Sequence, residues 1–311
     1  MSAPILAVRP RPVVRRFAAA TLAYTAFVIL FGAVVRITGS GAGCGQHWPT
    51  CHGDIAHLPK TVETAIELTH RVTSGLALVA VFALWFVTFR DEPRGHPARR
   101  LAFGAVVLML VEALIGAGLV LLSLVGKNDS VARAIVMPAH LLSTYALTAV
   151  LTLLVVWRGD ERAWLSTPPR LSPLLVASGL ALVLISATGA VTALGDTLYA
   201  PEAASLGARL VEDQASGAHF LARLRVVHPV LAVLGAALVA HAARRSGGRG
   251  ARAVVVLCVV QVAAGTLNVF LSAPGWLQIL HLALALALWI TFVLLAYDDA
   301  FAAPPRIAGK A

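Results

Sequence analysis

Charged side chains are scarce in this sequence. Only 13% of its 311 residues are Asp, Glu, Lys or Arg, whereas 59% are hydrophobic and the mean hydropathy is +0.82. A chain of this length has too few polar residues to cover a water-exposed globule, which excludes a soluble protein. Most of the chain must therefore face lipid, and we expect an all-α integral membrane protein.

Acidic residues are fewer than basic ones. The chain has 15 Asp and Glu and 25 Lys and Arg, which gives a formal net charge of +10. The basic residues fall in short segments between apolar runs, which argues against nucleic acid as a partner. Seventeen of the 25 lie in alternate connecting segments, at residues 9–16, 90–100, 158–170, 244–252 and 306–310. By the positive-inside rule these segments are cytoplasmic, as are both termini, and they meet the anionic lipids of the plasma membrane.

The N-terminal region lacks the features of a cleaved signal. Residues 1–16 carry four Arg and precede an apolar run from Phe17, but the run is too long for a cleaved segment. No A-x-A-type cleavage site ends this run before Arg36. We therefore expect residues 1–16 to stay as a cytoplasmic segment before a retained first span.

Eight apolar segments are long enough to cross a bilayer as helices. They are Phe17–Val35, Ile66–Phe89, Leu101–Val125, Val136–Trp157, Leu171–Leu194, Leu221–Ala243, Ala253–Leu271 and Trp276–Tyr297. Two long loops, Ile37–Ala65 and Gly195–Phe220, connect them on the outer side. Residues 298–311 form a cytoplasmic tail.

The two halves of the chain share short patterns. The Gly-Ala-Val sequence at Gly32 recurs at Gly189, and a polar residue four positions before Gly116 recurs before Gly265. Because each half has an even number of spans, both copies would have the same orientation in the membrane. We expect two pseudo-symmetric four-helix bundles, residues 17–157 and residues 171–297.

Four of the ten histidines lie inside apolar spans, where a polar side chain is costly and faces the bundle interior. They are His70, His140, His228 and His281, one in every second span. Two histidines from facing helices at similar depth can bind both axial positions of one haem iron. A lone histidine of this kind is more often a hydrogen-bonded structural residue, but four at equivalent positions favour two haem sites. Zinc or copper is disfavoured, because no Cys, Asp or further His converges at the same depth.

Charged residues adjoin these histidines. Glu67 precedes His70 by three residues on the same helix face, and Arg225 occupies the corresponding position before His228. Glu67 is therefore a candidate catalytic carboxylate, with an ion pair to Arg71 or Arg36 as the alternative. Arg71, Arg225 and Arg223 are candidate partners of haem propionates, or cations that reach lipid phosphates.

Cysteine is nearly absent, with three in the chain. Cys258 lies in an apolar span and is read as a small core residue. Cys44 and Cys51 lie in the first outer loop, in an oxidising compartment, where we expect a disulfide. The sequence leaves open whether that disulfide is structural or redox-active. A Cys-x-x-Cys-His site for covalently attached haem is absent.

Together these residues resemble the haem A synthase family of bacteria. The resemblance covers about Ala18 to Tyr297. Its carriers are Val35-Arg36-Ile37-Thr38-Gly39-Ser40-Gly41 leading to Cys44, Trp48-Pro49, Cys51, Glu67-Leu68-Thr69-His70-Arg71, and the histidines His140, His228 and His281.

The resemblance implies an oxidoreductase that converts the C8 methyl group of haem O to the formyl group of haem A, for use by terminal oxidases. It implies that His70 and His140 hold the substrate haem beside an essential Glu67, and that His228 and His281 hold a haem b that relays electrons. It also implies haem O synthase, terminal oxidase assembly proteins and a membrane electron donor as partners.

The sequence departs from that family in its outer loops. Residues 195–220 contain no second cysteine pair, and Gln46 and His47 stand where an acidic residue often precedes Trp-Pro. The rival function is a di-haem b-type quinol oxidoreductase, which also needs four histidines but gives no reason for a carboxylate in one half alone. A transporter ranks last, because the spans lack paired Gly and Pro interruptions at mid-membrane.

Overall fold

The computed structural model describes residues 9–157, 171–200 and 205–301, and these residues are helical with no β-strand among them. Eight helical spans in this part are long and apolar enough to cross a membrane, as predicted. The helices are α1 (Pro12–Ile37), α2 (Val62–Asp91), α3 (Pro97–Leu121), α4 (Val131–Val156), α6 (Pro173–Leu198), α9 (Val227–Ser246), α10 (Gly248–Phe270) and α11 (Gly275–Ala300). Two short helices, η1 (Ser40–Ala42) and α7 (Leu206–Gln214), belong to the connections, and α8 (Phe220–Arg223) begins the span that α9 completes.

Several predicted boundaries were wrong. The span predicted from Leu221 is present as Phe220–Ser246, but a 3-10 turn, η2 (Leu224–Val226), separates α8 from α9 within it. The predicted loop from Gly195 to Phe220 also contains the end of α6 and the helix α7. Hydropathy marks only the lipid-facing length, whereas hydrogen-bonded helix continues into the polar interface. Segment 158–170, which we predict to be cytoplasmic, lies outside the described residues, as do half of segment 1–16 and most of tail 298–311.

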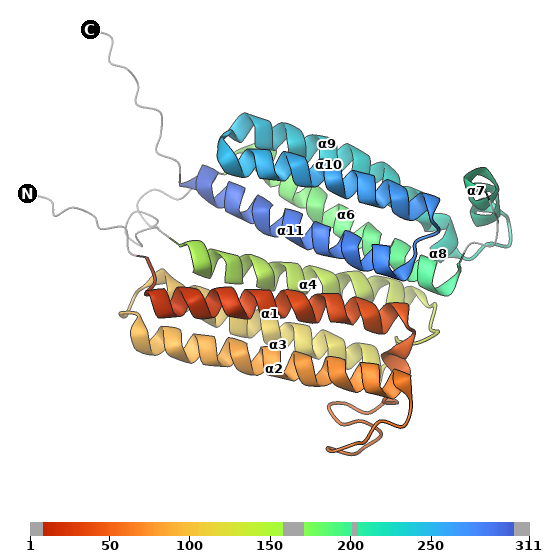
Figure 1. Ribbon diagram of the computed structural model, residues 1–311, viewed down its shortest axis with the longest axis horizontal. Helices are drawn as coiled ribbons and strands as arrows, with labels where there is room; N and C mark the ends of the chain where they lie inside the picture. The colour runs from red at the N-terminus through yellow and green to blue at the C-terminus, as the bar shows by residue number, and fades with distance from the viewer. Residues whose placement is uncertain (1–8, 158–170, 201–204, 302–311) are drawn as a thin grey trace, which may run out of the picture.

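The helices form two neighbouring groups of four (Figure 1). In the first group α1 packs against α2 and α4, and α3 completes the group between α2 and α4. In the second group α6 packs against α9, and α10 packs against both α9 and α11. α4 lies between the groups, in contact with α6 and α11. The division into residues 17–157 and 171–297, and any pseudo-symmetry between the halves, stay predictions.

Each group has its own apolar core, one around Leu84, Leu147 and Leu151 and the other around Leu175, Val239 and Val254. Side-chain caps fix where the histidine helices of the first group begin. Thr61 accepts a hydrogen bond from the Thr64 amide at the start of α2, and Ser130 accepts one from Arg133 at the start of α4. His70 and His140 are therefore the ninth and tenth residues of their helices, about 12 to 14 Å from the helix start.

Candidate functional site

Each of the four in-helix histidines rests on a glycine of the preceding helix. A Cβ atom built on that glycine would lie 3.0 to 3.6 Å from the Cε1 atom of the imidazole. The pairs are Gly32 with His70, Gly116 with His140, Gly189 with His228 and Gly265 with His281. These are the glycines whose repetition marks the two halves of the sequence. Their missing side chains let the imidazole rings lie directly against a neighbouring backbone.

His228 and His281 face each other across the second group of helices. Their ring centroids are 6.4 Å apart and the ring planes are nearly perpendicular, at 86°. Two imidazoles on opposite faces of one metal ion, each with a metal–nitrogen bond of about 2 Å, place their ring centres about 6 Å apart. The pair therefore has the spacing that a single haem iron requires.

His70 and His140 line the same cavity as the other pair. The cavity has a volume of about 1010 Å³ and is lined by residues from both groups of helices, including all four histidines. A volume at the upper end of the range for ligand sites suits a large planar group rather than a single ion.

Buried nitrogen atoms in this cavity lack hydrogen-bond partners. Among the described residues, the Nδ1 atoms of His70 and His281 are inaccessible and make no hydrogen bond. An unsatisfied imidazole nitrogen in an apolar interior is costly unless it binds something. The donor set and its spacing thus fit a haem-type group, with neutral imidazoles as axial ligands.

Glu67 is buried at the cavity wall, with 3% of its surface exposed. One carboxylate oxygen accepts hydrogen bonds from Arg71, including one of 3.1 Å from Nε, and the other accepts the Cys44 amide at 2.7 Å. The ion pair that the sequence offered as an alternative is therefore present. It fixes the carboxylate at the cavity edge, three residues before His70.

Arg71 and Arg225, predicted to bind propionates, already have protein partners. Arg71 also donates to the His47 and Thr50 carbonyls and so holds the first outer loop. Arg225 forms ion pairs with Asp196 at 3.2 Å and Asp213 at 2.9 Å. Both arginines line the cavity. Arg223 instead donates to two loop carbonyls, those of Ala215 and Ser216.

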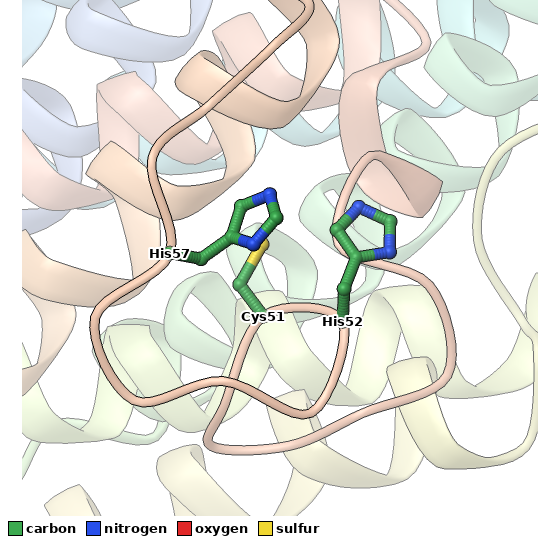
Figure 2. A group of neighbouring side chains, drawn as sticks. All are labelled: Cys51, His52 and His57. Carbon is green, nitrogen blue, oxygen red and sulfur yellow. The ribbon is translucent and has the colours of Figure 1, made fainter.

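The predicted disulfide between Cys44 and Cys51 is confirmed. Both cysteines are fully buried, and the loop between them places Trp48 and Pro49 at the cavity wall. Figure 2 shows Cys51 beside His52 and His57, and the possible metal-ligating atoms of the three lie within 4.8 Å of one another. Because the Cys51 sulfur is bonded to Cys44, this group offers two imidazoles and no thiolate.

Two polar residues of the cavity were missed as site residues from the sequence. The Glu112 Oε1 atom lies 3.1 Å from Nδ1 of His140, and the Gln261 Nε2 atom lies 3.3 Å from Nε2 of His281. Each is four residues before the glycine on which that histidine rests. The sequence shows the repeated pattern, but it does not show which side of each helix faces the histidine.

Arg36 was considered only as a partner of Glu67. In the structure the Arg36 side chain instead extends from α1 to the second group of helices. There it donates to the Ala193 carbonyl at 2.7 Å and to Gln278 at 2.9 Å. It lines the cavity on the side of the outer loops. A cation that bridges both halves at the cavity cannot be inferred from either half alone.

One known protein family matches nearly the whole helical region of the chain. Residues 15–293 match the model of the family described as cytochrome oxidase assembly protein, COX15-CtaA. A protein of Thermus thermophilus named "Protoheme IX farnesyltransferase" is 45% identical over 289 residues, which are 90% of this chain and 47% of that protein.

Proteins named "Heme A synthase" are also similar over shorter regions. The one from Alkalihalophilus pseudofirmus is 35% identical over 143 residues, 45% of each chain, and the one from Geobacillus thermodenitrificans is 36% identical over 142 residues, 45% of this chain and 42% of that protein. The matched regions thus span about half the length of these curated relatives. With nine-tenths of its length matched by one family model, the chain belongs to the COX15-CtaA family of cytochrome oxidase assembly proteins, as its resemblance to the haem A synthases predicts.

Proposed function

We propose that this protein is a haem A synthase of the plasma membrane, which oxidises the C8 methyl group of haem O to a formyl group. The spacing of His228 and His281, together with the opening of all four histidines onto one cavity, carries the proposal. The relatives named "Heme A synthase" support it. The electron donor and the terminal oxidase assembly proteins remain proposed partners.

In this proposal His70 and His140 hold the iron of haem O in the first group of helices. Glu67 lies at the edge of that pocket, where its carboxylate can accept a proton from the reacting carbon substituent. Arg71 and the Cys44 amide hold the carboxylate in one orientation. The loop that carries Trp48 and Pro49 forms part of the cavity wall.

His228 and His281 would hold a haem b in the second group. Bound there, haem b supplies one-electron transfer to the first pocket. In the second half Arg225 precedes the histidine by three residues, and the carboxylates at this position, Asp196 and Asp213, come from α6 and α7 and pair with it. In the first half the carboxylate, Glu67, lies on the same helix as the histidine.

The Thermus relative is named for farnesyl transfer to protohaem. The match covers 47% of that relative's length, so its named activity is not proposed for this chain. A farnesylated haem is instead the substrate proposed here, so a haem O synthase is its natural partner.

The test is to purify the protein after co-expression with a source of haem O and to separate the extracted haems by chromatography. We expect haem A from the wild type and little or none from Glu67→Gln, which keeps the shape of the side chain and loses its charge. Glu63→Gln is the matched control, because Glu63 is exposed in the same helix and outside the cavity.

The histidine variants separate the two pockets. Replacement of His70 or His140 should abolish haem A formation, whereas replacement of His228 or His281 should mainly remove bound haem b. Haem b alone in the wild type, with fast quinol oxidation, would support the di-haem quinol oxidoreductase instead. Unchanged absorption spectra in all four variants would refute histidine ligation altogether.

A further inference from the structure

Glu112 is an acidic residue in the apolar interior of α3, where the other charged residues, Arg99 and Arg100, stand near the helix start. An ionisable group at such a position faces the bundle interior and has a function more often than not. Its side chain is 13% exposed and lines the cavity. The reaction proposed above gives Glu112 no role.

Three side chains form a connected group around Glu112. Oε1 of Glu112 lies 3.1 Å from Nδ1 of His140, and Oε2 contacts the Ser143 hydroxyl. The Ser143 hydroxyl is also 2.9 Å from the carbonyl of His140. α3 and α4 are packed together along their length (Figure 1), so this group is held by the scaffold and not by a loop.

The other three histidines have different neighbours at the matching position. Four residues before the supporting glycine stand Val28 for His70, Ile185 for His228 and Gln261 for His281. Gln261 contacts Nε2 of its histidine, whereas Glu112 contacts Nδ1 of His140. The Gln261 amide is neutral, and Leu284 stands where Ser143 would be. One of the four candidate axial histidines therefore has a carboxylate against its ring.

We infer that Glu112 is a positioning residue that makes His140 an electron-rich axial ligand and lowers the reduction potential of the haem in the first pocket, while Gln261 leaves the second at a higher potential. The inference rests on the haem ligation proposed above. A carboxylate beside the free ring nitrogen of a ligating histidine fixes the ring and raises the basicity of the ligand. A more basic ligand stabilises ferric over ferrous iron.

The experiment is a redox titration of the purified full-length protein reconstituted with protohaem, followed by optical absorption. Glu112→Gln should lower the ferric-to-ferrous ratio of one haem about tenfold at a fixed ambient potential, equivalent to about 59 mV for a one-electron couple. Gln261→Glu should raise that ratio for the other haem by a similar factor. Each variant shifts the reduction potential of one haem. That haem is identified as the one that is lost in His140→Ala or in His281→Ala.

Ser143→Ala is the matched control for packing, because it removes a contact of Glu112 and leaves the carboxylate beside His140; we expect a smaller shift in the same direction. A Glu112→Gln protein with unchanged potentials, or a shift only in the haem lost in His281→Ala, would overturn the inference while leaving ligation intact. If Glu112→Gln does not fold, an unshifted potential in Gln261→Glu overturns it equally. A wild type without low-spin bis-histidine haem would overturn the proposed function as well.

Discussion

Trp289 of α11 stacks on Tyr145 of α4 at the junction between the two groups of helices. The ring centroids are 5.4 Å apart, the planes are inclined by 23°, and the indole Nε1–H donates to the Tyr145 carbonyl at 2.9 Å. α4 carries His140 and α11 carries His281, so this contact couples the two helices that bring one histidine of each pair to the shared cavity.

Replacement of Trp289 should weaken the junction. Loss of the stacking contact, about 0.5 to 1.5 kcal/mol, and of the hydrogen bond, about 1 kcal/mol, predicts that Trp289→Ala destabilises the haem-free protein by about 2 kcal/mol. Trp289→Phe should lose about half of this. The measurement is chemical unfolding in detergent. Trp276→Ala, at an exposed position of the same helix, should leave stability nearly unchanged, and an equal loss there would contradict the assignment.

The supporting glycines predict a graded series. A Cβ atom at Gly189 or Gly265 would lie 3.0 Å from the imidazole of His228 or His281, whereas one at Gly116 would lie at an ordinary 3.6 Å from His140. Overpacking costs about 1 to 3 kcal/mol, which corresponds to roughly a tenfold to hundredfold loss of haem affinity for Gly189→Ala and Gly265→Ala. Gly116→Ala should have little effect.

The series is read by haem retention and by the low-spin absorption spectrum. Gly118→Ala is the control, because a Cβ at that position meets no atom within 4 Å. If Gly118→Ala lost as much haem as Gly265→Ala, the effect would come from the helix and not from contact with the histidine.

A cluster outside the spans predicts a pH dependence. The Tyr199 hydroxyl donates to Asp129, and His219 stacks on Tyr199 with ring centroids 4.6 Å apart. The hydrogen bond lowers the pKa of Asp129 and raises the pKa of Tyr199. The contact should therefore be fully present above the usual carboxyl pKa of about 4 and be lost as the pH falls through the lowered pKa of Asp129. It should also be lost when alkaline pH ionises Tyr199.

The measurement is an ultraviolet titration of Tyr199, taken as the difference between the wild type and Tyr199→Phe. Asp129→Asn should return the pKa of Tyr199 toward its usual value near 10, because the neutral amide no longer penalises the phenolate. An unchanged pKa in Asp129→Asn would show that the hydrogen bond does not form in solution.

Features set by local chemistry could be predicted from the sequence. The eight spans follow from apolar runs alone, and the disulfide follows from two cysteines in one outer loop. The four histidines stood out because their neighbours in the chain are apolar. In each case the signal lies within the segment itself and needs no knowledge of what packs against it.

Features set by contacts between helices could not be predicted. Glu112 meets His140 only because α3 turns that face toward α4, and Arg36 finds its acceptors on α6 and α11. The 3-10 segment between α8 and α9 has a local cause instead, because Pro229 has no amide hydrogen to donate to the Arg225 carbonyl four residues earlier. The sequence offered two interpretations of Glu67, a catalytic carboxylate or a partner of Arg71. The structure agrees with part of each, because Glu67 pairs with Arg71 and also lies at the cavity wall.

The disulfide should hold Glu67 in place through the loop. The Cys44 amide donates to Glu67, and Arg71 joins the same carboxylate to two carbonyls of the loop that the disulfide closes. A disulfide of this kind contributes typically about 2 to 4 kcal/mol by restricting the unfolded loop. In Cys44→Ser/Cys51→Ser the loop should open locally, and the carboxylate should lose its amide donor.

Hydrogen exchange read by mass spectrometry tests this expectation. Amides of residues 44–57 should exchange faster in the double variant and in the wild type treated with a dithiol reductant, while amides of α3 keep their protection. Cys258→Ala, at a buried free cysteine of α10, should leave exchange in the loop unchanged. Equal protection of residues 44–57 with and without the disulfide would mean that the Arg71 and Glu67 contacts hold the loop by themselves.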